Sequence, residues 1–457
     1  MNTIKQLTAF AAALLLLGSC IKVNIEDNTG GTGTGANNQD DPNVTRILQG
    51  SYERNITLTG GKYTLKGYVY FQAGTTIRIP EGTIIVSDVA QKGALIIERG
   101  ARIEALGSAT RPIVFTSGNT PGNRRRGDWG GVILLGNAPT NRPLSPAPLI
   151  EGGVDRRYGG TNPDDNSGTM RYVRIEWAGI AAEPGSEING LTTGGVGRAT
   201  VLEYIQTSFA NDDAYEFFGG NHNAKYLVAY ATSDDDLDFD FGYQGNIQFA
   251  VLQRRPEIAD TDAGNGVESD NDGSGSFAAP RTRPVLSNIT WIGPNGAPNT
   301  EANINFANRW RRNSQFVVRN SIMMGFPQAG FSIESERSAV AYNTDSSVFA
   351  NNLVHALNNP YRSSDAGAQG VLSSTQIRTK AEANGCITYT DANAIGLTAP
   401  FNFDNPNYLP AAGSPALSGA VFTGLSSFFE AVTFRGAFGA TNWMTGWVSF
   451  TPQTNVY

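Results

Sequence analysis

Short β-branched runs that recur between glycine turns constrain the fold of this chain more than any other feature. They include GTTIRIPEGTIIVSD at 74–88, GALIIERGARIEALG at 93–107 and GDWGGVILLG at 127–136. Equivalent apolar positions lie 19 residues apart in three pairs: Ile77 and Ile96, Ile84 and Ile103, and Val114 and Ile133. Strands this short cannot bury a face alone, but stacked coils pair edge to edge and enclose a shared interior. A repeat of this length with no helix in each period therefore predicts a parallel β-helix.

Later segments keep this pattern with a longer and more variable repeat. The runs VLEYIQTS from Val201, YLVAYATS from Tyr226 and QFAVLQR from Gln248 start 25 and then 22 residues apart. VLSNITWIG from Val285 and FVVRNSIMMG from Phe316 continue the pattern beyond longer loops. A solenoid tolerates such loops because they leave the stack without breaking strand pairing. One elongated domain therefore explains 457 residues better than several globular cores, and 53 glycines suit its many turns.

The first twenty residues have the pattern of an export signal. Lys5 precedes an apolar stretch that is too short to span a bilayer, and Leu17-Gly18-Ser19-Cys20 resembles a bacterial lipobox. A lipid on Cys20 would hold the protein at a membrane; a plain secretory signal with a coincidental cysteine is the alternative. The expected organisation is a signal peptide at 1–19, a lipid anchor and flexible Gly/Thr/Asn tether at 20–45, a β-helix at 46–410 and a closing segment at 411–457.

Charge and residue counts exclude several classes of ligand. The net charge of −7 and the pI near 5.1 argue against a nucleic-acid or nucleotide partner bound through its phosphates. His222, His355, Cys20 and Cys386 are the only histidines and cysteines, which makes zinc improbable. Cys386 is expected to be a small buried residue. Any bound metal should therefore have oxygen ligands.

The densest cluster of ionisable residues is SDDDLDFDFG at 233–242. In a strand, Asp236, Asp238 and Asp240 would share one face. Close carboxylates repel unless cations, protons or water stabilise them, and Ca²⁺ takes six to eight oxygens at about 2.4 Å. The sequence therefore predicts a calcium site, with a solvated acidic loop as the alternative. The candidate ligands are Asp212, Asp213, Glu216, Asp234, Asp236, Asp238, Asp240, Glu268, Asp270 and Asp272. Glu216 and Asp238 lie 22 residues apart and are expected to stack on adjacent coils.

Several stretches resemble known proteins. GALIIERGARIEALGSATRPIVFTS with GDWGGVILLGNA is similar to the opening coils of right-handed parallel β-helices of the pectin-lyase-like superfamily, and NYLPAAGSPALSGA resembles a closing segment of such helices. NDDAYEFFGG, SDDDLDFDFGY and RGAFGATNWMTGWVSF resemble Bacteroidetes surface lipoproteins of this fold, mostly of unassigned activity. The resemblance implies an all-β, single-stranded right-handed parallel β-helix with loop insertions and a C-terminal cap, anchored in the outer membrane and exposed at the cell surface. It also implies a TonB-dependent outer-membrane transporter as a partner.

A non-catalytic binding or accessory role is the favoured functional hypothesis, with a glycan or the transport partner as ligand. Trp310, Arg311 and Arg312 form the one basic aromatic patch and are the candidate ligand-binding residues, with a solvated loop as the alternative. Trp443 and Trp447 are expected to cover the exposed edge of the last coil instead, because a solenoid must protect its ends.

The second hypothesis is a calcium-dependent polysaccharide lyase or glycoside hydrolase acting on an acidic polysaccharide. Asp212 and Asp213, with Asp235 and Asp236 about one coil later, superficially resemble the aspartates of polygalacturonase-type enzymes. The candidate catalytic residues are Asp213 and Asp236, with Arg254 or Arg255 as the base of a lyase. No Gly-His-Gly follows Asp236, so catalysis is the weaker of the two hypotheses.

Overall fold

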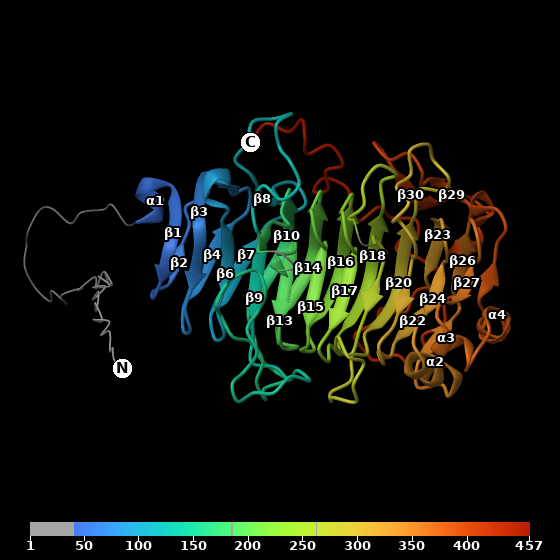
Figure 1. The fold of residues 1–457 in the computed structure, drawn as a ribbon. Helices are drawn as coiled ribbons and strands as arrows, with labels where there is room; N and C mark the ends of the chain where they lie inside the picture. Colours follow the sequence, from blue (N-terminus) through green and yellow to red (C-terminus); the bar gives the residue numbers. More distant parts are fainter. Residues whose placement is uncertain (1–40, 184–185, 262) are drawn as a thin grey trace, which may run out of the picture.

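The computed structural model describes residues 41–457 apart from 184–185 and 262, which form a right-handed parallel β-helix (Figure 1). Hydrogen bonds join 26 of its strands into one array. Two strand pairs outside the array are antiparallel: β11 (Ala181–Glu183) with β12 (Ser186–Glu187), and β29 (Leu397–Ala399) with β30 (Asn407–Pro410). The predicted fold class is confirmed.

The array folds into three faces, which we call the first, second and third sheets. The N-terminal strands β1 (Ile47–Tyr52) and β3 (Lys62–Phe71) lead into them. The first sheet contains β5 (Ile84–Ser87), β8 (Ile113–Ser117), β10 (Gly168–Glu176), β14 (Val201–Ser208), β16 (Asn223–Tyr230), β18 (Asn246–Gln253), β20 (Val285–Ile292), β23 (Ile322–Phe326), β26 (Leu353–Ala356) and β28 (Ile387–Thr388). The second sheet contains β2 (Ile56–Thr57), β4 (Thr76–Pro80), β7 (Arg102–Leu106), the first halves of β10, β14, β16, β18 and β20, then β22 (Val317–Arg319) and β25 (Val348–Ala350). The third sheet contains β6 (Ala94–Ile97), β9 (Val132–Leu135), β13 (Leu191–Gly194), β15 (Tyr215–Phe218), β17 (Leu237–Asp240), β19 (Glu268–Ser269), β21 (Arg309–Trp310), β24 (Phe331–Ile333) and β27 (Tyr361–Ser363).

The long strands pass from the second to the first sheet at a residue in the left-handed region. Tyr172, Tyr204, Tyr226 and Phe249 occupy this corner on successive coils, with φ between 53° and 61°. Their rings stack, with centroids 4.3 Å apart for the first two pairs and 5.2 Å for the third. A left-handed residue other than glycine costs about 1–2 kcal/mol, so the stacked rings help to offset the cost of each corner.

Coil length differs from the expected period near 19. Ile77 pairs with Ile103, 26 residues later, and Ile84 pairs with Val114, 30 residues later. The 19-residue spacing from Ile77 to Ile96 connects strands of two different sheets within one coil, because all three sheets use similar β-branched residues. Between later coils the offset varies: it is 22 between β14 and β16, where Ile205 pairs with Leu227, and 39 between β18 and β20, where Ala250 pairs with Ile289.

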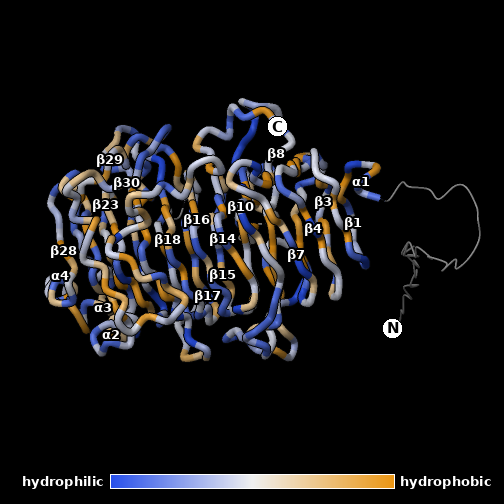
Figure 2. The backbone as a smooth tube through the Cα atoms, turned by 180° about the vertical axis from the view of Figure 1, so that it is seen from behind, coloured by the Kyte–Doolittle hydropathy of each residue, from blue (hydrophilic) through white to orange (hydrophobic). Residues whose placement is uncertain are grey.

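Buried apolar side chains fill the interior between the three sheets. One cluster extends from Leu48 to Cys386, and Figure 2 shows hydrophobic residues recurring from coil to coil. Trp129, Trp291 and Trp310 are fully buried within it. Since this interior is closed, ligands have access only to the outward faces of the sheets and to the loops.

Short helices surround the coils: α1 (Pro42–Thr45), η2 (Val89–Gln91), α2 (Glu336–Asn343), α3 (Ala366–Gln369), α4 (Ser374–Ala383), η3 (Ala392–Ile395) and η4 (Pro415–Leu417). Helix α4 starts with a capping box between Ser373 and Gln376, buries Ile377 and Ala381, and packs against β25 and β27. It therefore covers the last coils of the helix (Figure 1).

The closing segment 411–457 lies along the flank of the β-helix rather than over its last coil. Trp443 packs edge-on against Tyr226 at 5.4 Å, and Trp447 against Tyr204 at 6.1 Å. The chain ends near β8 and β10, as Figure 1 shows. The two tryptophans thus cover the stacked corner rings and not, as the sequence predicts, the edge of the last coil. The corner rings project outward and offer an aromatic surface on the flank, well before the last coil.

The predicted signal peptide, Cys20 and most of the tether lie outside the described residues. Within the described part, no helix is long and apolar enough to cross a membrane.

Candidate metal site on the third sheet

A row of carboxylates crosses the outward face of the third sheet. Glu216 of β15 pairs with Asp238 of β17, which pairs with Glu268 of β19. Their neighbours Phe217 and Phe239 point into the core, so alternation turns the acidic side chains outward. The predicted stacking of Glu216 on Asp238 is confirmed, and adjacent strands lie only about 4.8 Å apart, so the carboxylates are close neighbours.

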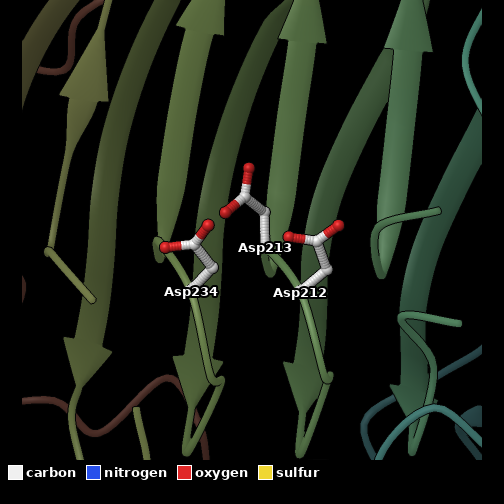
Figure 3. Close-up of side chains that lie close together, drawn as sticks. All are labelled: Asp212, Asp213 and Asp234. Atoms are coloured by element: carbon white, nitrogen blue, oxygen red, sulfur yellow. The ribbon is translucent and has the colours of Figure 1, made fainter. Parts of the chain in front are cut away.

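More carboxylates come from the turns that precede these strands. Asp212 and Asp213 lie before β15 and Asp234 lies before β17, with their side chains gathered between the two coils (Figure 3). The backbone N–H of Asp235 donates a 2.7 Å hydrogen bond to Oδ1 of Asp213, which ties the two turns together.

Three groups of carboxylates have ligand atoms that all lie within 4.8 Å of one another: Asp212, Asp213 and Asp234; Asp213, Glu216 and Asp238; and Asp235, Asp238 and Glu268. Two oxygens on opposite sides of a Ca²⁺ ion, each at about 2.4 Å, would be about 4.8 Å apart. Since Asp213 and Asp238 each belong to two groups, the three groups form one continuous acidic site. This acidic site has the donor chemistry that Ca²⁺ requires.

Asp236 does not share this face, contrary to the expected alternation. Its carboxylate is 0% exposed, lies 3.3 Å from Nη1 of Arg254 and accepts a 2.9 Å hydrogen bond from Thr232. Strand β17 starts only at Leu237, so Asp236 still belongs to the turn, where strand alternation does not apply. Asp235 takes its place beside Asp238 and Glu268.

Arg254 holds the turn that carries Asp234 and Asp235. Its fully buried guanidinium donates to the carbonyl oxygens of Ser233, at 2.8 Å, and of Asp234. Arg254 is therefore a positioning residue. It cannot be the base of a lyase, because a base has to touch the substrate and this guanidinium is fully buried. Arg255 points elsewhere and pairs with Glu257 at 2.6 Å and Asp404 at 2.7 Å.

Arginines of the next coil neutralise one side of the acidic row. Arg309 lies 2.7 Å from Glu268, Arg311 contacts Glu268 and lies 2.9 Å from Asp270, and Arg312 lies 2.6 Å from Asp270. Between them, Trp310 is fully buried and stacks on Phe316 in the core. The expected basic aromatic patch is therefore divided: Trp310 is not available to a ligand, because its position in β21 faces inward.

Burial and mutual repulsion raise the pKa of the carboxyls on the other side of the row. Desolvation is the largest cause for Asp212, Asp213, Glu216, Asp234, Asp238 and Asp240, and neighbouring carboxylates add to it for each. For Glu268, burial and Asp235 raise the pKa to about 8 against the opposing charges of Arg311 and Arg309. Protons or a shared cation would relieve this repulsion, because either one removes the charge that burial disfavours.

Asp272 stands apart from the acidic site. Burial would raise its pKa, but hydrogen bonds from Ser274 and Ser276 outweigh burial and lower the pKa to about 2. The Oδ1 atom of Asp272 accepts from the Ser274 hydroxyl at 2.7 Å and from the backbone N–H of Ser274 at 2.9 Å. This carboxylate is therefore engaged in organising its own loop.

Three further residues belong to the site although they were not among the predicted ligands. Asp235 follows Asp213 by 22 residues, the same offset as Glu216 and Asp238, so the coil spacing identifies it. Glu151 reaches the site from a loop insertion, where Nδ2 of Asn189 donates to its Oε1 at 2.9 Å and also to Glu216. Asn189 precedes Asp213 by 24 residues, the offset between the paired strands β13 and β15, so the coil spacing identifies it as well. No repeat spacing points to Glu151, since the coil period does not extend into an insertion.

Neither His222 nor Cys386 belongs to the three carboxylate groups of the acidic site. His222 is fully buried against Phe217 and Tyr243, and burial lowers its pKa to about 3. Cys386 is buried, as expected, and burial raises the pKa of its thiol to about 12.

Comparison with known proteins agrees with this architecture. Residues 50–399 match the family described as pectate-lyase-like β-helix domain. Neither the curated proteins nor the solved structures that were compared give a significant match. The matched range covers most of the chain and includes the whole acidic site, so the protein belongs to the pectate-lyase-like β-helix domain family.

Proposed function

We propose that this protein is a calcium-holding surface protein that binds an acidic glycan without cleaving it. The observation that carries this proposal is the charge imbalance across the third sheet. Glu268 and Asp270 have arginine partners, whereas no lysine or arginine lies within ion-pair distance of Asp213, Glu216 or Asp238 in the described part of the chain. A divalent cation is the partner that this arrangement of oxygens favours.

Partial exposure would allow the cation to contact a ligand. Asp212 and Asp234 are half-buried at the outer edge of the acidic site, whereas Asp213 is buried beneath them. A Ca²⁺ ion held by these three carboxylates would keep coordination positions open toward solvent, because Ca²⁺ takes six to eight oxygens. Sugar carboxylate and hydroxyl oxygens are suitable ligands for those positions.

Lipid attachment at Cys20 completes the proposal. The export signal and the lipobox-like Leu17-Gly18-Ser19-Cys20 support an outer-membrane anchor with the β-helix displayed at the cell surface, where it would serve a TonB-dependent transporter. Palmitate labelling of cells tests this anchor: wild-type protein should be labelled, whereas a Cys20→Ala variant that is still labelled would contradict it.

A calcium-dependent lyase is the second candidate, and the family match favours it. A lyase needs a base beside the metal. Arg254 is buried, and Arg309, Arg311 and Arg312 are all held in ion pairs with carboxylates; of these three, Arg312 has the most exposed side chain, at 44%. Because the arginines of the acidic site are engaged, its geometry supports binding better than turnover.

Calorimetric titration with Ca²⁺, followed by incubation with acidic polysaccharides, tests both candidates. We expect Ca²⁺ binding that Asp213→Asn abolishes and that Asp164→Asn, a change at an exposed carboxylate outside the acidic site, preserves. We also expect no rise in the absorbance of unsaturated sugar products. Absorbance that rises in wild-type protein but not in Arg312→Gln would establish the lyase, and no heat of Ca²⁺ binding would refute the metal site.

A further inference from the structure

We infer that a second site, beside the first strands of the third sheet, binds a sugar that carries a carboxylate or a sulfate. A cavity of about 520 Å³ lies beside the turn that follows β6, lined by Ala73, Glu98, Arg99, Asn137, Asp155, Arg156 and Arg157. Its volume lies within the roughly 300–1,000 Å³ that small-molecule sites occupy. The inference goes beyond the proposed function, because the cavity uses none of the carboxylates of the acidic site.

The wall of the cavity is a preorganised hairpin. Residues 149–157 lie in the insertion drawn below β9 in Figure 1, where Leu149 bridges Arg157 and the N–H of Ile150 donates to the Arg156 carbonyl at 2.8 Å. Ile150 and Val154 pack with Ile96 and Ile133 on the outer face of the third sheet. The hydroxyl of Tyr70 donates to the Val154 carbonyl at 3.2 Å, so both edges of the hairpin are fixed.

Positive charge dominates the lining. Three arginines face two carboxylates in a protein whose net charge is −7. Arg156 is neutralised by Glu98, with Nε 2.7 Å from Oε1, and its guanidinium lies 4.2 Å from the centroid of the Tyr70 ring.

The side chains of Arg99 and Arg157 are held by neutral hydrogen-bond acceptors. Nη1 of Arg99 donates to the Gly159 carbonyl at 3.1 Å, and Arg157 donates to the Ala147 carbonyl. No carboxylate lies within ion-pair distance of either one in the described part of the chain. Two arginines held by neutral acceptors favour an oxyanion, because guanidinium nitrogens match the geometry of carboxylate and sulfate oxygens.

The remaining lining favours a sugar over a bare ion. A single inorganic anion would leave most of the 520 Å³ to water. Asn137 and Asp155 line the same space, and their amide and carboxylate groups are suited to sugar hydroxyls. The cavity therefore has a cationic end at Arg99 and Arg157, which suits an anion, together with neutral and acidic polar groups that can accept hydroxyl hydrogens.

Ligand-observed NMR in the presence of EDTA tests the inference without calcium. The probes are glucuronate, glucose 6-sulfate, glucose and inorganic sulfate. We expect both acidic sugars to bind, and glucose and sulfate to bind at least tenfold more weakly. The relative strength of the two acidic sugars identifies the preferred oxyanion. Equal binding of glucose and glucuronate, or of sulfate and glucose 6-sulfate, would overturn the inference.

Two variants and a control locate the binding. Arg157→Gln alters an exposed side chain, and Arg99→Gln alters the half-buried one; each should weaken binding of the acidic sugars at least tenfold with the thermal unfolding temperature unchanged. Arg102→Gln, on the exposed face of the second sheet, should leave binding unchanged. Binding that survives in both pocket variants would place the sugar elsewhere, and a defective calcium site would not alter any of these results.

Discussion

At Asp238 a single carboxylate belongs to two of the three acidic groups. It lies between Glu216 on one coil and Glu268 on the next, and no hydrogen-bond donor contacts its Oδ1 in the described part of the chain. Burial and the charges of Glu268 and Asp235 raise its pKa well above the usual range. We therefore expect its substitution to change both the repulsion between the carboxylates and the proposed binding of Ca²⁺.

Replacing the Asp238 carboxylate should raise the unfolding free energy of the metal-free protein and lower that of the Ca²⁺-bound protein. Asp238→Asn removes one repelling charge, so metal-free protein at pH 8 should gain about 1–2 kcal/mol of unfolding free energy, since one pKa unit corresponds to about 1.4 kcal/mol. The same variant should lose the stabilisation that Ca²⁺ gives to wild-type protein. Urea unfolding with EDTA or Ca²⁺ measures both effects, with Asp164→Asn as the control. A variant that Ca²⁺ stabilises as much as wild type contradicts the assignment.

The raised pKa values also predict how stability depends on pH. A carboxyl with a folded pKa above its unfolded value keeps its proton longer in the folded state, so folding takes up protons and stability falls as pH rises. For Glu268 this loss spans the interval from its usual 4.5 to about 8. Metal-free protein should therefore be more stable at pH 5 than at pH 8, as measured by urea unfolding. Calcium should reverse or flatten this trend, because it binds the ionised form. Stability that rises across this interval in EDTA would be inconsistent with the acidic site.

Buried Arg254 should be required for the shape of the site rather than for chemistry. Arg254→Met leaves Asp236 buried and unpaired, which costs about 3–5 kcal/mol of unfolding free energy. The double variant with Asp236→Asn should recover part of this loss, and Arg198→Gln, which breaks the exposed pair with Asp164, should cost less than about 1 kcal/mol. A loss no larger than that of the control would show that the buried pair does not hold the turn.

At the scale of elements, side-chain amides on every second coil clamp the closing segment. Gln206 donates to the Ser449 carbonyl at 2.7 Å and accepts from its N–H at 2.9 Å, and Gln248 makes the same pair of hydrogen bonds with Glu430 at 2.8 and 2.9 Å. Asn320 repeats the arrangement with Val421 at 3.1 and 2.8 Å. These clamps replace strand pairing, because segment 411–457 contains no β-strand.

Removing one clamp should destabilise the protein measurably. Gln206→Met keeps the side-chain size but leaves the N–H and the carbonyl of Ser449 without their partner, which costs about 1–3 kcal/mol. Gln244→Met, at an exposed position, should cost less than about 0.5 kcal/mol. Urea unfolding compares the two, and equal losses would show that the clamp contributes little.

The sequence predicts where the strands lie better than it predicts which strands pair with one another. The runs at 74–88 and 93–107 became strands as expected, but their 19-residue spacing did not give the coil length. The 22-residue offset between Glu216 and Asp238 was informative because no insertion separates them. Glu151 enters the site through a hairpin insertion that no periodic pattern predicts. Trp310 faces inward because it alternates with Arg309, which pairs with the outward-facing Glu268, and because it lies in register with the core residue Ile333.

At the scale of the whole molecule, the outward face of the third sheet changes character along the helix axis. Ile96 and Ile133 lie beneath the hairpin insertion, Glu216 and Asp238 follow on later coils, and Arg309 comes after them. An apolar region, an acidic one and a basic one thus share one row of equivalent positions. The net charge of −7 does not reveal this sequence of apolar, acidic and basic regions, because it sums the charges of the whole chain.

The closing segment also determines when folding can finish. A β-helix can in principle add coils one after another as the chain is synthesised. Here the hydroxyl of Tyr457 donates to the buried carboxylate of Glu176 at 2.6 Å, across a separation of 281 residues. The coil that carries Glu176 is therefore covered on this flank only after a segment synthesised much later has docked, so a part of the protein that is made early is completed late.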